Sequence, residues 1–207
     1  MAEKQTMEKP SGWYKVARVL AGILMKTVFP VKFYGLDKLD AMEPPYMLIC
    51  NHQSWLDPVC LLHMVKKYDV RFLAKKELLE NKLIGGILNS MQVIGVDRHN
   101  SDMVAMRRCM QVLREGHILG VFPEGTRHKQ GVMEELEGGA AMIALRSKAS
   151  VLPVWIKEKI RPFRLNHCYV GDVISLEDLR EQGINKETCE KVLARFTQVY
   201  REMQKAV

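Results

Sequence analysis

The feature that most constrains this chain is a short apolar run that ends in a cluster of polar side chains. Residues Tyr46–Cys50 read YMLIC, a continuous apolar run that predicts a buried strand. Residues 51–58 follow as NHQSWLDP, which places an imidazole and a carboxylate just past the end of that strand. Open α/β sheets bind their ligands at such strand ends. We therefore expect a functional site here.

His52 and Asp57 have the chemistry of a general base and its orienting acid. Histidine is the side chain best suited to take up a proton near neutral pH. A nearby carboxylate can hold its tautomer and stabilise the imidazolium that forms. A second interpretation makes Asp57 a helix cap, either in a capping box with Ser54 or as the N-cap before Pro58. The spacing alone leaves both interpretations open.

Strand-like and helix-like segments alternate along the chain. Apolar runs predict strands at 31–35, 46–50, 70–74, 93–97, 118–122, 151–156 and 168–174. Helical patterns cover about 13–29, 58–67, 75–91, 101–115, 136–148 and 186–204. The alternation predicts one α/β domain over residues 31–207, with a central mostly parallel or mixed sheet flanked by helices. Pro153 lacks a backbone donor, so its strand is expected to be an edge or to carry a bulge.

The segment 13–29 has the pattern of an amphipathic helix. Apolar residues recur at three- and four-residue steps, and Lys15, Arg18 and Lys26 form a stripe opposite them. A basic helix with a tryptophan at its edge suits the interface of an anionic bilayer. The alternative is a helix that covers the domain core with its lysines in water. Because the apolar side includes Trp13, Ile23 and Leu24 near the chain end, we assign residues 1–30 to an N-terminal segment for membrane association. No apolar run reaches the ~20 residues that span a bilayer, so the association is expected to be peripheral.

The charge and cysteine content narrow the class of partner. A formal net charge of +7 implies an anionic partner, which is a nucleic acid, a phospholipid surface or a phosphorylated substrate. The aromatic residues do not interleave with the basic ones as a stacking platform for nucleic acid requires, so that partner is disfavoured. Five widely spaced cysteines without a Cys-x-x-Cys pair predict neither a zinc site nor a disulfide framework. They favour reduced thiols in a protein that faces the cytosol.

Two later strands end in residues that suit an anion. One delivers Arg98, and another is followed directly by Glu124, Gly125, Thr126 and Arg127. Arginine binds phosphate through a planar fork, Gly125 lets the backbone approach a ligand, and the Thr126 hydroxyl can donate. If the strands are parallel, these groups share one edge of the sheet with His52. The alternatives are surface ion pairs for the two arginines and an ordinary turn at Gly125.

Four segments of the chain stand in the order of four sequence blocks known from glycerolipid acyltransferases. They are NHQSWLD at 51–57, GVDR at 95–98, FPEGTR at 122–127 and VLPV at 151–154. Over about residues 31–175 the chain resembles the 1-acyl-sn-glycerol-3-phosphate acyltransferases of the PlsC type. The first and third blocks are specific by themselves. The second and fourth support the resemblance only because all four blocks occur in the same order.

The resemblance implies a reaction and a role for each matched residue. A fatty acyl group would pass from a thioester of acyl carrier protein or coenzyme A to the 2-hydroxyl of lysophosphatidate, giving phosphatidate, with no metal or other cofactor. His52 would be the general base and Asp57 its partner. Pro153 matches the block near the donor. The positions that match the glycerol phosphate site are Arg98, Glu124, Gly125 and Arg127.

Three alternatives to that reaction follow from the residues. The segment 136–140 reads LEGGA where the family often has an aromatic and two lysines, so another lysolipid acceptor stays open. A second alternative is a hydrolase in which Ser54 or a cysteine forms an acyl-enzyme, although no Gly-x-Ser-x-Gly elbow surrounds Ser54. A lipid-binding module without chemistry would account for the basic residues but would give His52 and Asp57 no role.

Overall fold

The computed structural model of the 207-residue chain describes residues 12–97, 102–127 and 133–207. The strands of the described chain are β1 Val31–Tyr34, β2 Tyr46–Cys50, β3 Val70–Lys75, β4 Ile94–Val96, β5 Ile118–Val121, β6 Ser150–Ile156 and β7 Asn166–Val170. Its helices are α1 Gly12–Thr27, α2 Leu36–Asp40, α3 Asp57–Met64, α4 Lys76–Glu80, α5 Gly85–Ser90, α6 Met103–Arg114, α7 Gly138–Ser147, α8 Glu177–Glu181 and α9 Lys186–Lys205.

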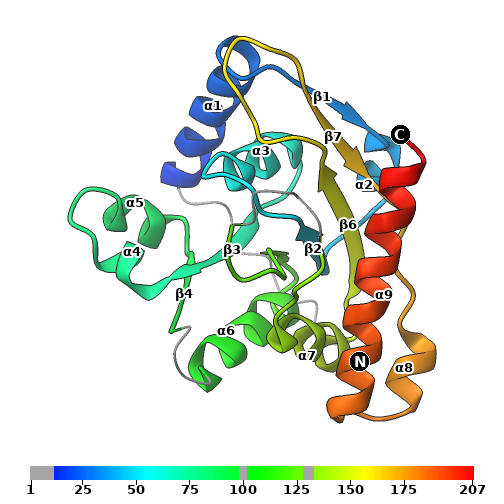
Figure 1. Cartoon of the computed structure of the whole chain (residues 1–207). Helices are drawn as coiled ribbons and strands as arrows, with labels where there is room; N and C mark the ends of the chain where they lie inside the picture. The colour runs from blue at the N-terminus through cyan, green and yellow to red at the C-terminus, as the bar shows by residue number, and fades with distance from the viewer. Residues whose placement is uncertain (1–11, 98–101, 128–132) are drawn as a thin grey trace.

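These strands form one mixed sheet with helices on both faces. The spatial order is β1-β7-β6-β2-β5-β3-β4, and the five strands from β6 to β4 are parallel. β7 runs antiparallel to β6 and parallel to β1. Helices α6, α7 and α9 cover one face, whereas α1, α2 and α3 cover the other (Figure 1). The single α/β domain with a flanked mixed sheet is therefore confirmed.

The apolar run in β2 is explained by its burial on both faces. All five of its residues are buried. Met47 and Ile49 pack in the cluster formed with α6, α7 and α9, while Leu48 and Cys50 pack in the cluster formed with α3. Successive side chains of a strand point to opposite faces, so a central strand of a covered sheet must be apolar throughout. The carboxyl end of this strand carries His52.

The single helix predicted over 75–91 is wrong. The chain instead forms α4 and α5, with a turn between them. The Asn81 side-chain oxygen accepts hydrogen bonds from the backbone N–H groups of Leu83 and Ile84, which competes with helical bonding. A Cβ atom at Gly85 would lie 2.2 Å from the carbonyl oxygen of Leu79, so only glycine allows the two short helices to meet this closely.

The segment 36–45, to which the sequence pattern assigns neither a strand nor a helix, contains α2 after Gly35, which lies in the left-handed region at φ 73°. Of the two positions expected for Pro153, an edge strand or a local bulge, the edge is excluded because β6 lies between β2 and β7, and the irregular pairing at Pro153 fits the bulge. The regular pairing of β6 with β7 covers residues 154–156 of β6. One isolated bridge then joins Val151 to Ile174. Pro153 lies in the interruption, which tolerates its missing donor.

Helix α1 packs on the domain by a different face from the apolar one seen in the sequence. Tyr14, Ala21 and Met25 are its buried residues, and Tyr14 and Ala21 pack beside α3. The apolar face remains in solvent, with Leu20 60% and Ile23 56% exposed. In the described part of the chain, no helix has both the length and the apolar character needed to cross a bilayer. The first eleven residues of the assigned 1–30 segment lie outside the described residues.

Candidate active site

The turn between β2 and α3 brings His52 and Asp57 into contact. His52 Nδ1 lies 2.8 Å from Asp57 Oδ2, and the carboxylate is fully buried. The same oxygen accepts hydrogen bonds from the backbone N–H groups of Gln53 at 2.6 Å and Ser54 at 2.7 Å. Asp57 is thus both the partner of the imidazole and the acceptor that fixes the turn. With a proton on Nδ1, Nε2 is the basic nitrogen of His52.

Two neighbours that the sequence did not single out hold His52 in place. The Asn51 side chain exchanges two hydrogen bonds with the backbone of Ile156, at 2.9 Å and 2.8 Å, and so joins the end of β2 to the end of β6. The ring of Phe122 stacks on the His52 imidazole with 4.3 Å between the ring centroids. Both residues lie inside the matched blocks, but only the folded geometry shows what they contact.

Glu124 lies behind His52 and does not line the cavity. Its side chain is buried, and Oε2 accepts a hydrogen bond from the His52 backbone N–H at 2.6 Å. Oε1 has no hydrogen-bond partner among the described residues. Burial is the main cause that raises the pKa of Glu124 to about 7, and the charge of Asp57 adds to it. This position does not support the place of Glu124 in the glycerol phosphate site that the resemblance implies, because the carboxyl group supports the His52 backbone instead.

The turn after β5 places Gly125, Thr126 and Arg127 at the mouth of a cavity. Gly125 has φ +65°, and a Cβ atom there would lie 2.7 Å from the Glu137 side chain, so the turn requires glycine. The exposed Arg127 guanidinium stacks on the ring of Trp55 at 4.3 Å. This cation–π contact pre-orients the arginine, and no sequence pattern indicated it.

Arg98 and Pro153 complete the set of predicted site residues. Arg98 follows β4 and lies outside the described residues, so its expected place beside Arg127 stays a prediction. Pro153 is in β6, paired with Ile49 of β2, and is not among the residues that line the cavity. Its position is in the sheet beneath the site.

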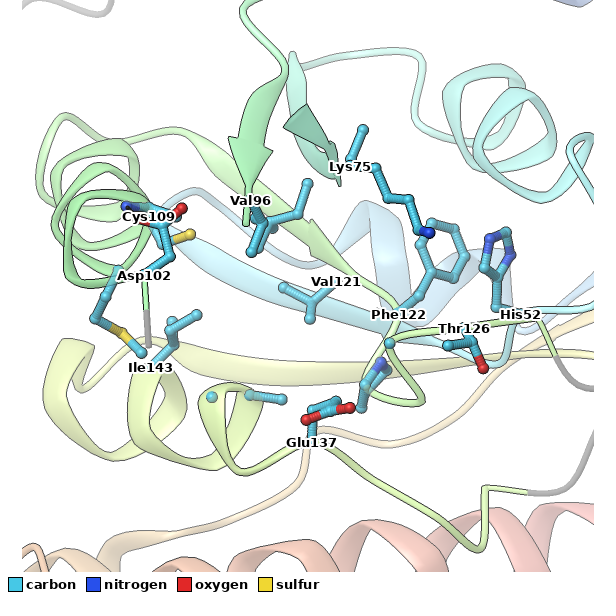
Figure 2. Close-up of a pocket in the computed structure, with 18 of the residues that line it drawn as sticks. His52, Lys75, Val96, Asp102, Cys109, Val121, Phe122, Thr126, Glu137 and Ile143 are labelled. Atoms are coloured by element: carbon cyan, nitrogen blue, oxygen red, sulfur yellow. Dashed lines mark hydrogen bonds between the residues drawn. The ribbon is translucent and has the colours of Figure 1, made fainter. Parts of the chain in front are cut away.

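Lys75 is a cation of the site. The sequence alone does not show which of the adjacent residues Lys75 and Lys76 faces the cavity. Lys75 ends β3 and lines the cavity, and Figure 2 shows its ammonium group directed toward Phe122 and His52. Lys76 instead lies 3.9 Å from Glu80 on α4. Of these two lysines, Lys75 is therefore the one that adds positive charge to the site, because Lys76 already belongs to α4 and lies beside Glu80.

The cavity has a volume of about 690 Å³ and extends from His52 into the space between the sheet and the helices α6 and α7 (Figure 2). Its mouth carries the polar side chains His52, Lys75 and Thr126, whereas Val121, Cys109 and Ile143 are among its apolar walls. Asp102, at the far end, accepts hydrogen bonds from backbone N–H groups as the N-cap of α6. Among the described residues, no group of three or more His, Cys, Asp or Glu side chains is placed to hold a metal ion.

Comparisons with known proteins agree on one family. The family model described as "Acyltransferase" matches residues 30–157. The 1-acyl-sn-glycerol-3-phosphate acyltransferase of Bacillus subtilis (strain 168) is 33% identical over 140 residues, which are 68% of this chain and 69% of that protein. The enzyme of the same name from Streptococcus pneumoniae (strain ATCC BAA-255 / R6) is 28% identical over 97% of this chain and 76% of its own length.

A solved structure shares the fold. The crystal structure of the 1-acyl-sn-glycerophosphate (LPA) acyltransferase PlsC from Thermotoga maritima superposes with a TM-score of 0.69 at 21% identity. The match covers 94% of this chain and 80% of that chain. It supports the order of layers described above.

Replacing Glu124 with Gln is expected to remove a pH dependence of stability. The folded protein holds the Glu124 proton up to a pKa of about 7, whereas the unfolded chain releases it near the ordinary 4.5. Between these values the wild type therefore loses stability as the pH rises, and Glu124→Gln does not share that loss. Urea unfolding of both proteins at about pH 5 and about pH 8 measures the difference. If the unfolding free energies of the wild type and Glu124→Gln differed by the same amount at both pH values, this role of the buried carboxyl group would be contradicted.

Proposed function

Because this chain belongs to the acyltransferase family, we propose that it transfers a fatty acyl group from a thioester to the 2-hydroxyl of 1-acyl-sn-glycerol 3-phosphate, giving phosphatidate. The observation that carries the proposal is the buried His52–Asp57 pair at the mouth of a long apolar cavity. The relatives named above support the choice of acceptor. The donor is a thioester of acyl carrier protein or coenzyme A.

His52 acts as the general base in this proposal. Its Nε2 takes the proton of the acceptor hydroxyl while the oxygen attacks the thioester carbonyl. The C–S bond then breaks, and the imidazolium returns the proton to the departing thiolate. Asp57 stabilises the imidazolium through Nδ1 and keeps Nε2 directed at the site. The acyl group therefore passes directly from sulfur to oxygen, and the hydroxyl proton ends on the thiol, without a covalent acyl-enzyme.

The phosphate of the acceptor is assigned to the mouth of the cavity. Arg127 offers a bidentate fork there, and Lys75, which also lines the cavity, adds a second cation. Gly125 and Thr126 bring backbone and a hydroxyl group into reach. Arg98 belongs to this seat by the resemblance of its block. In this arrangement Glu124 positions His52 and does not contact the acceptor.

The apolar part of the cavity is assigned to an acyl chain. Its walls between the sheet and α6 and α7 are lined by residues such as Met106, Val121 and Ile143. Burial of each methylene group contributes about 0.8 kcal/mol, so transfer of a fatty chain from water into such a cavity is favourable. The bound chain would extend away from His52 and leave the reacting end at the mouth.

The protein is proposed to act at a membrane surface through α1. Trp13, Leu20 and Ile23 form an exposed apolar face on this helix, and Lys15 and Lys26 flank it. A helix of this kind lies in the interface of an anionic bilayer, where both lipid substrates are found. The cytoplasmic face is assigned because all five cysteines are free thiols.

His52→Gln is expected to lower the transfer rate by at least about 100-fold, because the acceptor hydroxyl loses its general base. Thiol released from acyl-coenzyme A in the presence of lysophosphatidate measures the rate. Ser54→Ala is the comparison variant: it removes one hydrogen bond to Asp57 and is expected to lower the rate far less than His52→Gln, whereas a serine nucleophile would make it equally inactive. Transfer retained in His52→Gln, or lost equally in Ser54→Ala, would contradict the assignment of the base.

Arg127→Ala is expected to raise the apparent KM for lysophosphatidate by about 10-fold or more, because a hydrogen bond to a charged group contributes about 1.5–3 kcal/mol. Arg127→Lys retains the positive charge without the bidentate fork, so its KM should lie between the values of the wild type and Arg127→Ala. Initial rates with each substrate varied in turn provide the test. An effect confined to the thioester would contradict the phosphate seat.

Replacing Leu20 and Ile23 together with Ser is expected to weaken partitioning onto phosphatidylcholine vesicles by at least about 10-fold, because burial of each side chain contributes about 1.5–3 kcal/mol. Co-sedimentation with vesicles measures the partitioning, and an assay in detergent checks that the active site is intact. Unchanged partitioning would refute α1 as the docking element.

A further inference from the structure

A second cavity lies between α1 and the end of α3, away from the site described above. This groove has a volume of about 550 Å³. Lys15, Lys26 and Lys66 line it together with His63, so cations contribute from both of the elements that form it. Among the described residues that line the groove, none is acidic. Its charge is therefore not neutralised within its own walls.

The fourth cation of the groove, Arg18, already has partners within the protein. Its guanidinium donates to the carbonyl oxygen of Lys66 and lies 3.9 Å from Asp69. The end of α3 contributes about half a negative charge through its carbonyl groups. The three lysines exceed that charge, and a positive field remains in the groove.

His63 reports this field from inside the groove. Burial, followed by the charges of Lys66 and Lys26, lowers the pKa of His63. The lysines therefore act on the imidazole across the groove and disfavour another positive charge there. The other titratable groups that line the groove with His63 are all basic. The ring of Phe33 packs beside the imidazole with 5.8 Å between the ring centroids, and Gly22 lies against it, since an added Cβ atom there would be 3.5 Å from His63 Nδ1.

The rim of the groove continues into an apolar surface. Val19 and Ile23 line the groove, and more than half of each side chain is exposed. A phosphate group with hydrocarbon attached meets both surfaces at once, because its charge faces the lysines and its chains face these side chains. A free phosphate ion would leave the apolar rim in water.

We propose that this groove is a binding site for the head group of an anionic phospholipid of the bilayer. Lys15, Lys26 and Lys66 contact the phosphate beside His63, Gly22 adds no side chain to this wall of the groove, and the acyl chains pass over Val19 and Ile23. The site is separate from the catalytic cavity, with which it shares none of its lining residues. The inference rests on the proposed membrane docking and adds the lipid that α1 selects.

The first test follows His63 by NMR in the full-length protein. Dihexanoyl phosphatidylglycerol, added as a monomer, is expected to raise the pKa of His63 by about 1, because an anion enters beside the imidazole. Dihexanoyl phosphatidylcholine should leave the His63 titration unchanged. Inorganic phosphate at the same concentration separates the two sources of a phosphate group. An equal rise with inorganic phosphate, or no rise with phosphatidylglycerol, would overturn the assignment to a lipid.

The second test fills the groove without changing its charge. Gly22→Leu is expected to abolish the additional vesicle binding that phosphatidylglycerol produces over pure phosphatidylcholine. Gly22→Ala is the matched control, since its Cβ atom makes only ordinary contact with His63 and should retain that binding. If the lysines attracted the membrane only as diffuse surface charge, Gly22→Leu would keep the full increment, and this outcome would overturn the groove site.

The third test removes the charge of the groove. Lys26→Gln together with Lys66→Gln should weaken binding to phosphatidylglycerol vesicles about 25-fold, since each basic residue near an anionic surface contributes about fivefold. Lys186→Gln with Lys191→Gln on α9 is the control and should leave binding unchanged. Equal losses in both pairs would contradict the groove. Loss of binding to pure phosphatidylcholine as well would instead point to the docking helix, so the two failures are distinguishable.

Discussion

The fully buried carboxylate of Asp57 is the group on which the geometry of the site depends. A buried charge is tolerated only when its oxygens are satisfied, and here the donors are the His52 ring and the backbone and hydroxyl of the adjacent turn. All of these donors come from the six residues that link β2 to α3. The need to satisfy one charge therefore fixes the turn and the imidazole together. The helix-cap and catalytic interpretations of Asp57 describe the same set of hydrogen bonds.

Glu124 shows how two neighbouring acids reach different states in one site. Asp57 has several donors, whereas Glu124 has the His52 backbone N–H and leaves Oε1 without a partner among the described residues. Burial is then poorly compensated, and the pKa of Glu124 rises to about 7. With its pKa raised to about 7, Glu124 carries less negative charge beside Asp57 than an ordinary glutamate would, and it still accepts from the His52 backbone. Asp57 thus holds the imidazole of His52, while Glu124 holds its backbone.

The sequence predicted the parts of this protein in which local pattern and global burial agree. The apolar run of β2 requires a central strand, and Gly125 requires a tight turn, so both were found from residue type alone. The break between α4 and α5 was missed because it depends on the side chain of Asn81 and on how closely two backbones approach. The role of Glu124 and the choice of Lys75 over Lys76 depend on direction in space, which composition does not contain. The exposed face of α1 could not be told from a core face, because both are apolar.

Helix α3 connects the catalytic pair to the surface proposed to face the membrane. Asp57 is at its first residue and His63 is near its last, a separation of about 9 Å along the helix axis. Its inner side chains are buried against the sheet, and α1 packs along it. Such a short, packed helix moves as one body, so the orientation of α1 on a bilayer also sets the orientation of His52. A lipid head group held in the groove would therefore place the mouth of the cavity at a fixed angle to the membrane, without any change in the structure of the site itself.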